Sequence, residues 1–134
     1  MECDAGERGR RSRLGLAGFM VVAGIMHFVA PHRYEKIVPR WLGDTRRVVL
    51  ASGAAELACG ALLLSRRTAR FGGWLTAALL VVVYPANIQM LLDAGTEHQA
   101  VPMPVDRFRV IALGRLPLQL PLIAWATRVA RRAA

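Results

Sequence analysis

Residues 71–92 read FGGWLTAALLVVVYPANIQMLL, a run of 22 residues without one charged side chain. A helix of this length would extend about 33 Å at 1.5 Å per residue, enough to cross about 30 Å of hydrocarbon. Three further apolar runs of 17 residues occupy positions 14–30, 48–64 and 110–126. A chain of 134 residues is too short to bury four such helices in water. The sequence therefore predicts an all-α fold, an integral membrane four-helix bundle.

Charge is segregated from these apolar runs. Apolar residues make up 54% of the chain, yet there are also 18 Lys and Arg, and the basic residues flank the runs. This is how membrane proteins use positive charge, so we reject a nucleic-acid partner. No small-residue cleavage site follows the first run, which favours an uncleaved span over a signal peptide. We expect a basic tail at 1–13, the membrane domain at 14–126 and a second basic tail at 127–134.

The loops also indicate an orientation. Both tails and the loop at 65–70 hold ten Lys or Arg together, whereas the two alternate loops hold seven. Positive charge is retained in the cytoplasm, so both termini are predicted to be cytoplasmic in a multi-pass membrane protein.

The loop between the first two runs has a helical apolar stripe of its own. Its members recur at intervals of three and four: Tyr34, Ile37, Val38, Trp41 and Leu42. Pro39 restricts the residue before it and should interrupt the helix after about one turn. We expect a short interfacial segment between helices 1 and 2, with Tyr34 and Trp41 at headgroup level.

Each apolar run contains an isolated polar residue: His27, Glu56, Asn87 and Arg115. Such groups are costly in a bilayer unless they face a partner or a wet cavity, so they mark candidate functional sites. Counted from the loops, Glu56 and Arg115 differ in depth by about three residues, or about 4.5 Å. We predict a buried contact between these two, with His27, Asn87 and Gln119 in the same intramembrane polar pocket.

Helix periodicity supports a shared interior. Arg115 and Gln119 are four residues apart, and Tyr84 and Asn87 are three apart, so each pair lies on one helix face. Tyr34 and Tyr84 are predicted to support the pocket. The alternative is that the Glu56–Arg115 pair only fixes helix register.

The sequence encodes no recognisable catalytic set and no metal site. There are three histidines and two cysteines, and none is spaced for a shared metal. We therefore expect an accessory component rather than an enzyme by itself.

Four segments resemble the DoxX-like family of small four-helix membrane proteins. They read AGIMHFVAPHRYEKIVP at 23–39, SGAAELACGALLL at 52–64, YPANIQM at 84–90 and GRLPLQLPLIAWA at 114–126. The resemblance implies a four-helix bundle in the bacterial cytoplasmic membrane, associated in some members with quinone-linked redox systems. The resemblance also implies that the polar positions of the family correspond in this chain to His27, Glu56, Asn87, Arg115 and Gln119. The region 40–47, often proline-rich in that family, reads RWLGDTRR here, and a redox cysteine pair is absent from the sequence.

Three functions remain open at this point. The first is an accessory subunit of a membrane redox system, in which the polar pocket holds a quinone and the partner is a membrane or redox protein. The second is a non-catalytic assembly or interaction factor embedded in the lipid bilayer. The third is a small proton-coupled transporter, which would work as a homo-oligomer. The expected Glu56–Arg115 pair argues against the third, because such pumps expose an unpaired carboxylate with a pKa near neutrality.

Overall fold

The computed structural model describes residues 2–99 and 101–133, and these are helical or irregular throughout. The elements are α1 (Glu2–Val29), α2 (Pro31–Glu35), η1 (Arg40–Leu42), α3 (Thr45–Leu64), α4 (Ala69–Val82), α5 (Tyr84–Leu92) and α6 (Val105–Arg132). Four helical stretches, with α4 and α5 counted as one, are long and apolar enough to span a membrane. The predicted all-α four-helix membrane fold is confirmed, and the chain is a multi-pass membrane protein.

The helices are longer than the apolar runs from which they were predicted. α1 begins at Glu2 rather than near residue 14, and α6 continues to Arg132, so both basic tails are helical extensions. Arginine, glutamate and alanine are strong helix formers, and a helix that is already nucleated extends through them without apolar burial. Hydropathy located the spans correctly but not the ends of the helices.

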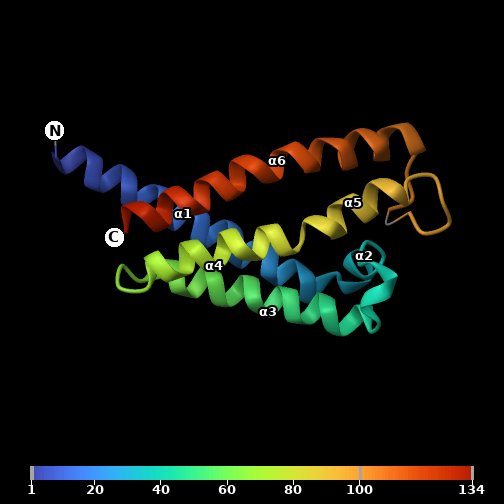
Figure 1. The fold of residues 1–134 in the computed structure, drawn as a ribbon, viewed down its shortest axis with the longest axis horizontal. Helices are drawn as coiled ribbons and strands as arrows, with labels where there is room; N and C mark the ends of the chain where they lie inside the picture. Colours follow the sequence, from blue (N-terminus) through green and yellow to red (C-terminus); the bar gives the residue numbers. More distant parts are fainter. Residues whose placement is uncertain (1, 100, 134) are drawn as a thin grey trace.

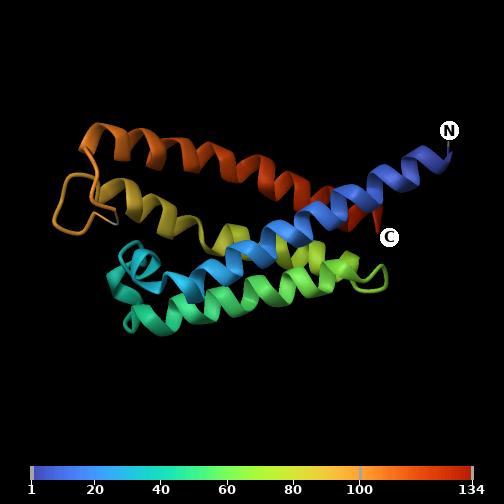
Figure 2. The same cartoon turned by 180° about the vertical axis from the view of Figure 1, so that it is seen from behind.

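The four long helices run side by side (Figure 1). α1 packs along α3, α3 packs against α4, and α6 packs against both α4 and α5. Both termini and the α3–α4 turn lie at one end, which we call the terminal end. The view from behind shows α2, η1 and the loop before α6 together at the opposite end (Figure 2).

Two apolar clusters hold these helices together. The larger joins α1, α3, α4 and α6 near the terminal end and contains Leu16, Ala17, Met20, Cys59, Leu63, Ala77, Ala126 and Val129. The smaller lies at the opposite end and contains Ile37, Met90, Ala94, Phe108 and Ala112, with Tyr34 packed against it. Helix α5 and the short segment after α1 are thereby fixed to α6.

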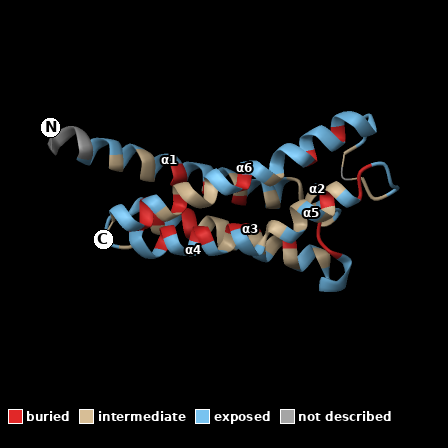
Figure 3. Cartoon of the chain, turned by 45° about the horizontal axis from the view of Figure 1, so that its top comes forward, coloured by how far each residue is buried: buried red, intermediate tan, exposed pale blue. Residues whose placement is uncertain are grey.

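The outer faces of the helices remain apolar. Val22 is 62% exposed, Phe71 63% and Val110 70%. Figure 3 shows buried residues along the inner seam, while exposed residues cover the outside. In a protein with four spans, such faces are the surfaces that contact lipid.

Glycines set the spacing between α1 and α3. A Cβ added at Gly24 would lie 2.8 Å from the carbonyl oxygen of Gly53, and one added at Gly53 would lie 2.7 Å from the Cβ of His27. Small residues permit this close backbone approach between membrane helices. The crossing therefore brings His27 against α3.

The predicted interfacial segment is two short pieces rather than one flat helix. α2 ends at Glu35 and η1 begins directly after Pro39, as the proline predicted. Ile37 and Val38 are buried, whereas Trp41 is 78% exposed. Because the helix is interrupted, the stripe divides into a part that covers the bundle and a part that faces outward.

Candidate functional site: a buried polar cluster at the α1–α3 crossing

His27 and Glu56 meet where α1 crosses α3. The Nδ1 atom of His27 lies 3.1 Å from Oε2 of Glu56, and each side chain is only 12% exposed. Nδ1 also lies 2.9 Å from the carbonyl oxygen of Ala23, one turn earlier in α1. Oε2 of Glu56 is buried without a hydrogen-bond partner, because Nδ1 is directed at that carbonyl. A buried carboxylate oxygen without a donor is energetically costly and attracts a donor or a proton.

Tyr34 completes this cluster from α2. Its ring stacks on the imidazole of His27 with centroids 3.9 Å apart and an angle of 26° between the planes. Burial raises the pKa of the Tyr34 hydroxyl above its usual value, while the positive charge of Arg115 partly opposes this rise. Tyr34 was predicted to support the pocket, and it contacts His27 directly.

Glu56 does not contact Arg115, contrary to the predicted pair. Among the described residues, the ionisable side chain within ion-pair distance of Glu56 is that of His27. Arg115 forms no ion pair within the described residues and is exposed on α6, although its charge acts on His27 and Tyr34. Depth counting placed the two groups at similar levels, but it carries no information on the rotation of each helix about its axis. Since Arg115 does not neutralise Glu56, no ion pair between these two residues speaks against a transporter.

Asn87 and Gln119 form a second polar group between α5 and α6. The Asn87 amide donates a hydrogen bond to Oε1 of Gln119. The Gln119 amide in turn donates to the backbone carbonyl of Leu80 in α4, and Gln119 is buried. Tyr84, which begins α5, forms no hydrogen bond or ring contact in the described part of the chain.

This second group supplies a hydrogen bond to a backbone carbonyl at the break between α4 and α5. The helix ends at Val82 and restarts at Tyr84, with Pro85 at the start of the new helix. Pro85 has no N–H to donate to the carbonyl of Val81, yet the carbonyl that a side chain pairs is that of Leu80. At Pro117 and Pro121, by contrast, α6 continues without interruption. Gln119 thus serves as a side-chain substitute for a missing backbone donor.

The predicted pocket is therefore divided into two polar groups. We call His27, Tyr34 and Glu56 the polar cluster, and Asn87, Gln119 and the Leu80 carbonyl the helix-break group. No hydrogen bond or ion pair joins them among residues 2–99 and 101–133. No set of three or more metal-ligating side chains was found among the described residues.

Sequence reasoning missed two contacts at the terminal end. The guanidinium of Arg13 donates to the carbonyls of Leu63 and, at 2.6 Å, Leu64, so it caps the last turn of α3. The indole Nε1 of Trp125 donates to Oγ of Ser12 at 2.8 Å and ties α6 to α1. A basic residue at the edge of an apolar run indicates an interface position but does not show which helix it will cap.

Comparisons with known proteins add a family. No curated protein and no solved structure matches the chain. The family model described as a domain of unknown function, DUF8561, matches residues 16–130, from the first core residues of α1 to the last turn of α6. The chain belongs to this DUF8561 family.

Proposed function

We propose that this membrane protein binds a quinone, or a similar lipid-like molecule with a carbonyl head, at the polar cluster. It would act there as an accessory component of a redox system in a bacterial cytoplasmic membrane. The observation that carries this proposal is the buried Oε2 of Glu56, which lies without a hydrogen-bond partner beside His27. The resemblance to DoxX-like proteins supports the same reading.

The cluster supplies what a quinone head requires. Quinone carbonyl oxygens accept hydrogen bonds, and reduced quinols donate them, so a site needs both donors and an acceptor. The Tyr34 hydroxyl and Nε2 of His27 form no hydrogen bond within the described residues, so both remain available to a ligand. The hydroxyl can donate, whereas Nε2 accepts when the imidazole is neutral with its proton on Nδ1 and donates when the ring is protonated. Glu56 offers an acceptor, and the exposed guanidinium of Arg115 provides a nearby positive charge.

The position of the cluster suits a ligand that arrives from lipid. His27 lies in the last turn of α1, and Tyr34 lies in the short helix that follows it. Phe28 and Val29, beside His27, are 46% and 69% exposed on the face available to lipid. A molecule with an apolar tail could place its head at the cluster without crossing an aqueous barrier.

The test is mass spectrometry of quinones that co-purify with the full chain from native membranes. We expect the wild-type protein to retain quinone and the Glu56→Gln, His27→Gln double variant to lose it. Glu97→Gln is the control, because it removes an exposed carboxylate from the loop before α6. Equal quinone content in all three proteins, at matched yield and helicity, would refute the proposal.

A second candidate is a non-catalytic assembly factor, which the helix-break group favours. Asn87 and Gln119 satisfy one another and the Leu80 carbonyl, so their polar atoms act in packing. If the polar cluster serves packing as well, bulk lipid alone should co-purify with the protein. The Glu56→Gln, His27→Gln variant would then lose stability without a change in bound molecules.

A further inference from the structure

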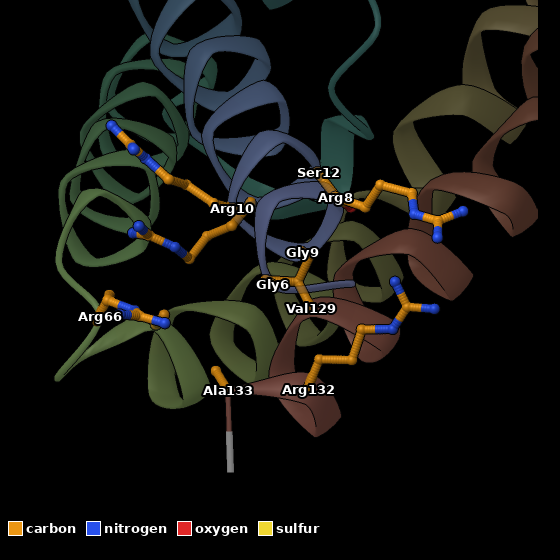
Figure 4. A pocket seen from close by; sticks show the side chains of 11 residues that line it. Gly6, Arg8, Gly9, Arg10, Ser12, Arg66, Val129, Arg132 and Ala133 are labelled. Carbon is orange, nitrogen blue, oxygen red and sulfur yellow. The ribbon is translucent and has the colours of Figure 1, made fainter. Parts of the chain in front are cut away.

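Arginines from three parts of the chain converge on a cavity at the terminal end. This cavity has a volume of about 710 Å³ and is lined by parts of α1, the α3–α4 turn and the end of α6. Five of its lining residues are arginines: Arg8, Arg10, Arg13, Arg66 and Arg132. We call this cavity the arginine groove. In Figure 4, Arg10 and Arg66 lie to one side of Gly6 and Gly9, and Arg8 and Arg132 lie to the other.

Among the described residues, no acidic side chain lines the groove. The nearby Glu7 pairs with Arg11 at 2.9 Å. Arg66 and Arg132 make no side-chain hydrogen bond or ion pair in the described part of the chain, whereas Arg13 is held by the end of α3. The groove therefore contains guanidinium groups that are available to an anion.

The groove is open at its centre. A Cβ added at Gly6 or Gly9 would meet nothing within 4 Å, so small residues leave space between the two sets of arginines. Guanidinium groups bind phosphate oxygens through paired N–H donors, which makes arginine well suited to a phosphate group.

Lipid is favoured over a free anion because of what surrounds the groove. The groove lies at the ends of the membrane spans Gly6–Val29 and Val105–Arg132. Directly beyond its lining residues, Leu14 on α1 and Phe71 on α4 are 37% and 63% exposed. A phospholipid bound by its phosphate would thus find apolar helix faces beside its acyl chains. Basic pockets between membrane helices bind anionic headgroups in this way.

We propose that the arginine groove binds the phosphate of an anionic phospholipid headgroup, such as that of phosphatidylglycerol. This site is separate from the polar cluster, since His27 lies 14 residues beyond Arg13 on α1, about 21 Å at the helical rise. The inference does not depend on the proposed function, and each can fail alone.

Native mass spectrometry of the full chain, taken from nanodiscs of phosphatidylcholine and phosphatidylglycerol, tests the proposal. We expect the wild-type protein to retain phosphatidylglycerol in preference to phosphatidylcholine. The Arg66→Gln, Arg132→Gln variant should bind phosphatidylglycerol about 30-fold more weakly, since each arginine near the membrane surface contributes a factor of about five. Circular dichroism would verify that the variants remain folded.

The adjacent arginines provide a matched control. Arg67→Gln with Arg131→Gln removes the same charge from the same turn and helix, but neither residue lines the groove. This control should retain most of the affinity. If both variants lost the same affinity for phosphatidylglycerol, general surface charge would explain the binding, and the proposal would be overturned. Displacement of phosphatidylglycerol by inorganic phosphate would also overturn it, in favour of a soluble anion.

Discussion

Replacement of Gly53 by alanine should separate α1 from α3 at the polar cluster. The added Cβ would lie 2.7 Å from the Cβ of His27, 3.0 Å from the ring of Phe28 and 3.1 Å from the Gly24 carbonyl oxygen. Ordinary contact begins near 3.4 Å, so the two helices must move apart by about 0.7 Å locally. One of the nearest atoms is backbone and another is a Cβ, so a change of side-chain rotamer alone cannot relieve the overlap.

The expected loss of stability in Gly53→Ala follows from overpacking at the α1–α3 crossing. Extra carbon atoms forced into a well-packed core typically cost about 1–3 kcal/mol of stability. The same movement would lengthen the distance between His27 Nδ1 and Glu56 Oε2 from 3.1 Å to about 3.8 Å and so weaken their electrostatic contact. Gly53→Ala should therefore lower stability and also weaken quinone retention, although no polar residue is changed.

The assay is equilibrium unfolding in mixed micelles with a denaturing detergent, followed by circular dichroism. Gly18→Ala on α1 is the matched control, because a Cβ at Gly18 would meet nothing within 4 Å. An alanine there should be neutral or slightly stabilising, by up to about 1 kcal/mol, owing to its better helix propensity. If Gly53→Ala were as stable as Gly18→Ala, the close α1–α3 crossing would be refuted.

Three further changes test other parts of the structure. Gln119→Leu should lower the free energy of unfolding by about 1–3 kcal/mol, because it leaves the Asn87 amide and the Leu80 carbonyl without their hydrogen-bond partner. A double-mutant cycle with Asn87→Leu should show strong coupling, and additive effects would contradict the hydrogen bond between the two side chains. In a Tyr84→Phe variant, ultraviolet absorbance should show that Tyr34 titrates above pH 10.0, because burial raises its pKa. The stability that the neutral hydroxyl contributes is complete below pH 10.0 and is lost as the pH rises through the raised pKa. Titration at or below pH 10.0 would contradict the burial of Tyr34. Arg13→Gln should destabilise the chain by about 1–2 kcal/mol through loss of the α3 cap and increase hydrogen exchange in the last turn of α3, whereas unchanged exchange there would argue against the cap.

Polar residues illustrate where sequence reasoning succeeds and where it stops. Four helical segments and a short broken helix around Pro39 were predicted from the sequence. Asn87 and Gln119 were predicted to share a pocket but not to pair, and the structure joins them by a hydrogen bond. The partner of Glu56 was not, because residue depth can be counted along a helix whereas its rotation cannot. Gln119 was recognised as polar and intramembrane, but its bond to Leu80 depends on where the α4–α5 break falls.

By itself, the sequence determined that the chain is a four-helix membrane bundle. Long uncharged runs must form helices in a bilayer, since backbone groups there have no water to bond. Only the tertiary structure decided which polar groups meet. Gly24 and Gly53 let α1 and α3 approach until His27 reaches Glu56, while Arg115 is left exposed on α6. The convergence of arginines at the terminal end was likewise decided there, because it joins residues from the two ends and the middle of the chain. Helix formation is local, whereas helix rotation and pairing arise from the packing of all the helices together.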